Sequence, residues 1–155
     1  MGGELEKLAY EEALRALDKQ ERLLEELRAR TGVLIAVSSL AASFLGPQAF
    51  LHPSPKGLVV TALAAFVGTL GASLFILAPK RRLVFAAAGA EIYEGFYAIK
   101  EDMAEVYRRL ALDLDGYWES NEGEMVWMGR AFALAAAALV VETLTMALLL
   151  GGSLF

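Results

Sequence analysis

The stretch that decides the fold is residues 58–77, LVVTALAAFVGTLGASLFIL, in which no residue carries a charge. An α-helix rises about 1.5 Å per residue, so a stretch of this length reaches about 30 Å, the thickness of the hydrocarbon core of a bilayer. The basic run Lys80-Arg81-Arg82 follows closely and is typical of a helix that ends at the lipid headgroups. We therefore predict a membrane-spanning helix over residues 55–78.

Two further stretches share this character. Residues 131–150 carry one ionisable side chain, Glu142, and residues 31–51 carry none. Gly46-Pro47 is expected to interrupt the helix within 31–51, because proline cannot donate a backbone hydrogen bond. We predict an all-α integral membrane protein with three transmembrane helices, at 31–51, 55–78 and 131–150. A soluble protein with a buried helical hairpin is less favoured, since two of the stretches are long and nearly free of charge.

Basic residues indicate the orientation of these helices. Arginine and lysine precede the first span, follow the second and precede the third, whereas residues 46–57 offer only Lys56. Because positively charged flanks stay in the cytoplasm, the N-terminus and residues 79–130 are predicted to be cytoplasmic and the C-terminus to lie outside. The expected location is the inner (plasma) membrane of the cell, as a multi-pass protein.

The remaining residues are predicted to form cytoplasmic helices. Apolar side chains recur every three or four positions within 4–30 and 79–130, a spacing that is typical of amphipathic helices. In the first region they are Leu5, Leu8, Leu14, Leu17, Leu24 and Leu27. No strong breaker separates residues 4–30 from the first span, and the second region leads into the third span across Gly116 and Gly123. We expect a cytoplasmic helical bundle continuous with spans one and three, all within a single domain of residues 1–155.

Composition argues against several function classes. The net charge of −5 disfavours nucleic-acid binding. The chain has no cysteine and one histidine, His52, so thiol nucleophiles, Cys-ligated metals and His-based triads are disfavoured. The acidic side chains between Asp113 and Glu124 lack a defined metal-ligand spacing and indicate a solvated surface. We expect no enzyme activity, no cofactor and no metal.

Glu142 is the candidate functional residue. A carboxylate near the middle of a bilayer is expensive unless it is neutral or partnered. Its candidate partners are hydroxyl groups on the other spans: Ser38, Ser39, Ser43, Thr61, Thr69 and Ser73. Two interpretations stay open, a protonated glutamic acid that hydrogen-bonds to a neighbouring helix and a group that takes part in proton or ion transport.

Two further sets of residues point to the membrane. Small side chains let helices approach closely, either inside one chain or between copies; on the second span they are Ala64, Gly68, Gly71 and Ala72. Basic and aromatic residues at the span ends are predicted lipid-headgroup anchors; they are Lys80, Arg81, Arg82, Arg130 and Trp127.

The order of parts, together with three local strings, resembles small bacterial membrane modules of the Pycsar transmembrane effector and SLATT type. The strings are Arg30-Thr31-Gly32-Val33-Leu34, Leu77-Ala78-Pro79-Lys80-Arg81, and Leu110-Ala111-Leu112-Asp113-Leu114 followed by Trp118 and Asn121. The resemblance implies an anti-phage effector that disrupts membranes. Because the chain has no room for a separate nucleotide-binding domain, a partner or the cytoplasmic bundle would do the sensing.

The leading functional hypothesis is therefore a non-enzymatic membrane protein that forms homo-oligomers in the lipid bilayer and permeates it when triggered. The first alternative is a membrane anchor or scaffold that docks a soluble protein partner through its cytoplasmic helices. The second alternative is a subunit for proton- or ion-coupled transport that uses Glu142.

Overall fold

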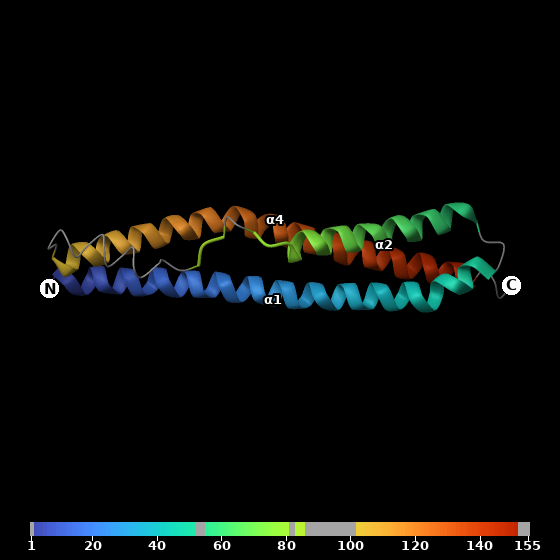
Figure 1. The fold of residues 1–155 in the computed structure, drawn as a ribbon, viewed down its shortest axis with the longest axis horizontal. Coiled ribbons are helices and arrows are strands. Elements are labelled where there is room, and N and C mark those ends of the chain that lie inside the picture. The colour runs from blue at the N-terminus through green and yellow to red at the C-terminus, as the bar shows by residue number, and fades with distance from the viewer. Residues whose placement is uncertain (1, 52–54, 81–82, 86–101, 152–155) are drawn as a thin grey trace. The chain divides into compact units, whose positions relative to one another are not determined.

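The structure is a computed structural model that describes residues 2–51, 55–80, 83–85 and 102–151. In that part of the chain it consists of three helices and contains no strand (Figure 1). They are α1 (Gly2–Leu51), α2 (Lys56–Leu77) and α4 (Met103–Gly151). The predicted all-α class is confirmed. The predicted anchors Arg81 and Arg82, residue His52 and the predicted helical residues 86–101 lie outside the described residues.

The two long helices each join a charged segment to an apolar one. α1 has 50 residues and α4 has 49, and neither is interrupted. The expected break at Gly46-Pro47 is wrong, because α1 continues through Pro47. Proline removes one backbone hydrogen bond, that of the Ser43 carbonyl one turn before it. The helix continues despite this single loss, and the Ser43 hydroxyl adds a hydrogen bond to the Ser39 carbonyl at 2.7 Å.

The expected helix over residues 79–130 is correct only in part. Residues 103–130 belong to α4, but residues 83–85 are not helical. The side chain of Asn121 takes both hydrogen-bonding groups of the Val84 backbone, which competes with helix formation at that residue.

The chain divides into two compact units, each of which takes one half of α1 and one half of α4. Unit 1 comprises Met1–Glu25 with Lys80–Val126, and unit 2 comprises Glu26–Pro79 with Trp127–Phe155. The division follows the charge pattern. The charged residues that fall in unit 2 are Glu26, Arg28, Arg30, Lys56, Arg130 and Glu142. Unit 2 thus holds all three predicted spans, and unit 1 holds most of the charge.

Within each unit α1 and α4 run in the same direction. In unit 1 the rings of Tyr10 and Tyr107 lie 5.6 Å apart, and Asn121 bonds Gln20. In unit 2 Ser38 bonds Glu142. The residue numbers rise together along both helices, so the pairing is parallel. Because the pairing is parallel, α4 begins at the same end of unit 1 as α1.

Burial on both long helices repeats every seven residues. On α1 the buried positions include Leu17, Leu24, Thr31 and Ser38. On α4 they include Leu114, Asn121, Met128, Ala135, Glu142 and Leu149. A seven-residue repeat is the mark of coiled-coil packing. It corrects the predicted apolar stripe of residues 4–30, since Leu5, Leu8 and Leu14 are exposed while the polar Gln20 is buried.

In unit 2, α2 packs against α4 in the opposite direction. The Thr69 hydroxyl lies 3.5 Å from the carbonyl oxygen of Ala135, and a Cβ atom on Gly68 would lie 3.8 Å from that of Ala138. The buried side of α2 is made of small side chains and one isoleucine, namely Ala62, Ala65, Thr69, Ser73 and Ile76. Unit 2 is therefore a three-helix bundle with a core of mostly small residues.

The α1–α4 pairing predicts that core and surface leucines of unit 1 behave differently. Leu114 is 3% exposed and Leu112 is 58% exposed. Leu114→Ala should lower the free energy of unfolding of unit 1 by about 2–5 kcal/mol, because it leaves a cavity between the helices. Urea unfolding followed by Trp118 fluorescence, in a Trp127→Phe background, measures this loss. Leu112→Ala is the control; an equal loss for both variants would contradict the assigned packing.

An exposed cluster of ion pairs lies at the start of α4. Both guanidinium nitrogens Nε and Nη2 of Arg108 donate to the carboxylate of Glu105, at 2.8 and 2.7 Å, and Arg109 Nε donates to it at 3.1 Å. The hydrogen bonds from Arg108, then those from Arg109, lower the pKa of Glu105 from 4.5 to about 2. The carboxylate lies in the first turn of α4, where the helix dipole also favours negative charge.

This lowered pKa predicts a pH dependence of unit 1. A carboxyl whose pKa is lower in the folded state contributes stability above its ordinary pKa and loses it as the pH falls through the folded value. The contribution of Glu105 should therefore disappear between pH 4.5 and about 2. Unfolding of the Glu105→Gln variant should vary less with pH in that range than unfolding of wild type. Replacing the exposed Glu119 by Gln should leave the wild-type profile in place.

Candidate functional site

The exposure of side chains in unit 2 is the reverse of that in a water-soluble bundle. Its fully or almost fully buried side chains include Thr31, Ser38, Thr69, Ser73, Glu142 and Thr145. Large apolar side chains cover its surface: Val33, Val37, Leu40, Val60, Leu63, Val67, Leu74, Phe75, Leu77, Leu134, Val140, Val141, Leu144 and Leu148. Such a unit buries polar groups and offers hydrocarbon to its surroundings, as a protein in lipid does.

Two helices are long and apolar enough to cross a membrane. They are α2 and α4, and only 28% of the apolar window of each is buried within the structure. The predicted span at 31–51 lies in α1, but the side chains of residues 44–45 and 48–51 lie outside the described part. That third span stays a prediction.

Glu142 lies at the centre of the polar core of unit 2. Its side chain is 0% exposed, and Ser38 Oγ donates to its Oε2 at 2.6 Å. Its other oxygen, Oε1, is buried without a hydrogen-bond partner among the described atoms. One carboxyl group on α4 is thus joined to one hydroxyl on α1, with half of its bonding capacity unused.

The other hydroxyls proposed from sequence as partners of Glu142 make no hydrogen bond to it among the described atoms. Ser39 and Ser43 are exposed, and Ser43 Oγ bonds the Ser39 carbonyl. Thr69 is buried but donates to the carbonyls of Ala65, at 3.0 Å, and Ala135. The seven-residue repeat explains the difference, because it turns position 38 inward and positions 39 and 43 outward.

Most of the remaining core hydroxyls bond their own helix. Thr31 Oγ1 donates to the carbonyl of Leu27 at 2.7 Å, and Thr145 Oγ1 donates to that of Val141 at 2.6 Å. Ser73 Oγ is buried without a partner among the described atoms. Hydroxyls that bond carbonyls of the preceding turn are satisfied without a second helix. Among the described residues of unit 2, Ser38 and Glu142 thus form the side-chain hydrogen bond that joins α1 to α4.

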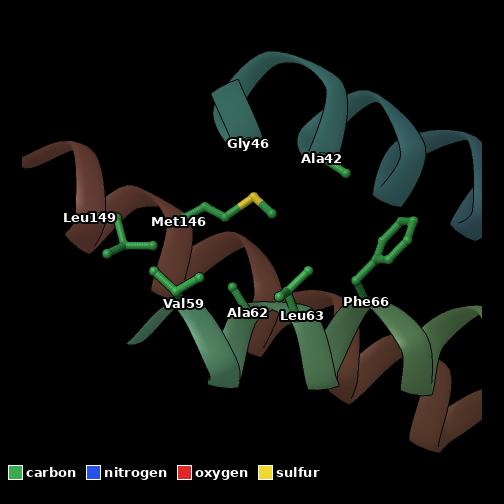
Figure 2. A pocket seen from close by; sticks show the side chains of 8 residues that line it. All are labelled: Ala42, Gly46, Val59, Ala62, Leu63, Phe66, Met146 and Leu149. Atoms are coloured by element: carbon green, nitrogen blue, oxygen red, sulfur yellow. The ribbon is translucent and has the colours of Figure 1, made fainter. Parts of the chain in front are cut away.

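An apolar cavity of about 150 Å³ lies one helical turn beyond this link (Figure 2). Ala42 and Met146, which line it, follow Ser38 and Glu142 by four residues each. Figure 2 shows Val59, Leu63 and Phe66 projecting from α2 toward the α1 segment at Ala42 and Gly46. Ala62 and Leu149 complete the lining. The cavity has contributions from all three helices and offers no charged group.

The predicted small-residue face of α2 is only partly used inside the chain. Gly68 packs against Ala138 of α4, and Ala72 is half-buried. Ala64 and Gly71 are exposed, and a Cβ atom at Gly71 would meet nothing within 4 Å. The internal contact uses the neighbouring side of the helix, so these two positions stay on the surface of unit 2.

Of the predicted headgroup anchors, Trp127 and Arg130 lie together. Trp127 is 61% exposed, and the guanidinium carbon of Arg130 lies 5.2 Å from the centre of its ring, a cation–π arrangement. Lys80 is half-buried just after α2. An aromatic ring with a basic partner suits the boundary between hydrocarbon and water.

A second buried polar cluster, in unit 1, surrounds Asn121. Its Nδ2 donates to the Val84 carbonyl at 2.8 Å, and its Oδ1 accepts the Val84 N–H at 3.1 Å. The same Nδ2 lies 3.3 Å from Gln20 Oε1, and Gln20 Nε2 donates to the Trp118 carbonyl at 3.1 Å. The side-chain amide of Asn121 thus pairs with both the N–H and the C=O group of Val84, as the backbone of a neighbouring β-strand would. Nothing in the sequence spacing predicted this role.

Unit 1 also carries an open groove of about 540 Å³ beside this cluster. Its apolar lining comes from Leu23 on α1 and from Trp118, Met125 and Val126 on α4, with Lys19 and Glu122 at the surface. Other large apolar side chains of unit 1 are exposed as well: Leu5, Leu8, Met103 and Leu112. Exposed apolar patches on a charged unit mark surfaces that bind other molecules.

No group of three or more histidine, aspartate or glutamate side chains within the described residues could hold a metal ion. Comparisons with models of protein families, with curated proteins and with solved structures found no match to this chain.

The Asn121 cluster predicts a local effect on the Val84 backbone. Asn121→Ala removes both hydrogen bonds to Val84 and leaves Gln20 with one partner fewer, at a cost of about 1–3 kcal/mol. Hydrogen–deuterium exchange at the Val84 amide should therefore be faster than in wild type, because the amide loses its hydrogen-bond acceptor. Ser120→Ala changes an exposed neighbour and should leave the exchange rate at wild-type level. Equal rates in both variants would show that Asn121 does not hold this segment.

Proposed function

We propose that this chain is a non-enzymatic membrane protein that crosses the bilayer three times, associates with copies of itself and raises the permeability of the membrane when triggered. The observation that carries the proposal is the reversed exposure of unit 2, with small and polar side chains inside and large apolar ones outside. A surface of this kind is stable in lipid and unstable in water.

The basic residues that flank the apolar segments support one orientation. Arg28, Arg30 and Arg130 precede the apolar parts of α1 and α4, and Lys80 follows α2. By the positive-inside rule, unit 1 faces the cytoplasm of the cell, whose inner membrane holds unit 2, and the C-terminus lies outside. The Trp127–Arg130 pair fits the cytoplasmic headgroup layer in this orientation.

Two observations support association between copies. The cavity of unit 2 is apolar and small, so a polar path for ions needs surfaces from more than one copy. The exposed small residues Ala64 and Gly71 permit close approach of a second α2 helix. The resemblance to Pycsar transmembrane effectors and SLATT proteins points to the same activity, bacterial anti-phage defence by membrane disruption.

The groove of unit 1 favours a second candidate function, a membrane anchor that docks a soluble protein. Its apolar floor around Leu23, Trp118 and Met125 is flanked by charged groups, as at many protein–protein interfaces. In this case the spans hold unit 1 at the membrane and carry no activity of their own.

Oligomeric state and membrane leakage together test the proposal. Purified protein in detergent should exceed the mass of one chain by light scattering, and its expression should collapse the membrane potential of the producing cells. Gly71→Leu should weaken both effects severalfold, because a larger side chain blocks close helix contact. Val67→Leu, at an exposed position on the same helix, is the matched control.

A strictly monomeric protein that leaves the membrane potential intact would overturn the proposal. Recovery of one stoichiometric soluble protein with wild type, and its loss with Trp118→Ala, would then establish the anchor function instead.

A further inference from the structure

We propose that Glu142 is a proton-binding site in the core of unit 2: at neutral pH it holds one proton as an uncharged carboxylic acid and in that form links α4 to Ser38 of α1. This inference is independent of self-association and leakage, because it concerns the core of one copy.

Among the described residues, no buried side chain of unit 2 offers Glu142 a compensating positive charge. Besides Glu142, the buried side chains of the described part of unit 2 are Thr31 and Ser38 on α1, Ala62, Ala65, Thr69, Ser73 and Ile76 on α2, and Met128, Ala135, Thr145, Met146 and Leu149 on α4. None of them ionises. Burying a carboxylate without a cation costs far more free energy than one hydrogen bond regains. The group therefore takes up a proton and becomes neutral.

The basic residues of unit 2 lie too far from Glu142 along the helices to balance the charge of its carboxylate. Arg30 precedes Ser38 by eight residues and Arg130 precedes Glu142 by twelve, which is roughly 12 and 18 Å at the helical rise. Lys56 is exposed at the start of α2. Arg30 is moreover engaged with Glu26 one turn away on the surface of α1.

The geometry favours a proton over a metal cation as the ligand of this site. Metal cations in proteins require several oxygen ligands around a space that fits the ion. Here the hydroxyl of Ser38 already donates to Oε2, and the hydroxyls of Thr31, Thr69 and Thr145 donate to carbonyls of their own helices. The nearby cavity is lined by apolar side chains and does not include Glu142.

The hydrogen bond also indicates which oxygen carries the proton. Oε2 accepts from Ser38 at 2.6 Å, so the proton belongs on Oε1, the oxygen without a partner among the described atoms. Loss of this proton would place a charge in the α1–α4 interface. The pairing of the two helices within unit 2 is therefore coupled to proton occupancy.

Infrared spectroscopy of the full chain in lipid bilayers tests the proposal directly. Carboxyl groups in water are ionised at neutral pH and give no carboxylic-acid carbonyl band. Wild type should show one such band at neutral pH, equivalent to one group per chain, that shifts in D₂O. The band should be absent from Glu142→Gln. No band in wild type, or a band that persists in Glu142→Gln, would overturn the proposal.

A second pair of variants keeps Glu142 in place and guards against misfolding of Glu142→Gln. Ser38→Ala removes the hydrogen bond to Oε2, so the carbonyl band should remain and move to higher frequency. Ser39→Ala changes the exposed neighbour and should leave the band where it is. An unmoved band in Ser38→Ala would show that the acid is not held by Ser38. A band that vanishes in Ser38→Ala would overturn the proposal, because removing a hydrogen-bond donor from the carboxyl group disfavours its ionised form.

Discussion

The parallel pairing of α1 with α4 is the contact on which the rest of the structure depends. Within each unit the buried positions of both helices recur every seven residues, so the same side of each helix faces its partner along its length. In unit 1 the non-helical segment 83–85 binds α4 through the hydrogen bonds between Val84 and Asn121. In unit 2, α2 packs against α4 through Thr69 and Gly68.

The chemistry of the buried positions changes between the two units. In unit 1 leucines alternate with an amide pair, Gln20 and Asn121, which is surrounded by hydrogen-bond partners. In unit 2 the same repeat is occupied by Thr31, Ser38, Met128, Ala135, Glu142 and Leu149. Water drives apolar side chains inward in the first setting, whereas in lipid the helices gain by close packing and by burying polar groups. The same seven-residue repeat thus carries two chemically different cores.

Much of the fold could be predicted from the sequence because charge and hydropathy are local properties. The span at 55–78 corresponds to α2, and the helix that crosses Gly116 and Gly123 is part of α4. The continuation through Pro47 could not be predicted, because the cost of one lost hydrogen bond depends on neighbouring groups such as Ser43.

The candidate site was predicted less completely than the fold. Glu142 stands out in any charge-poor span, but its partner does not: Ser38 and Ser39 are adjacent and chemically identical, and only the packing of α1 on α4 distinguishes them. A seven-residue count through Leu17, Leu24, Thr31 and Ser38 would have found the partner. This repeat is difficult to recognise in the sequence because only two of its four residues, Leu17 and Leu24, are large and apolar.

The parallel pairing also has a consequence for biosynthesis. Ser38 and Glu142 are 104 residues apart in the chain, and Gln20 and Asn121 are 101 apart. Contacts between such distant segments form late, since the intervening chain must be made and its ends brought together first. During synthesis Ser38, in the apolar half of α1, therefore stays without its partner Glu142 until α4 has emerged from the ribosome. A chain that stalls before Glu142 leaves that half of α1 without its partner on α4.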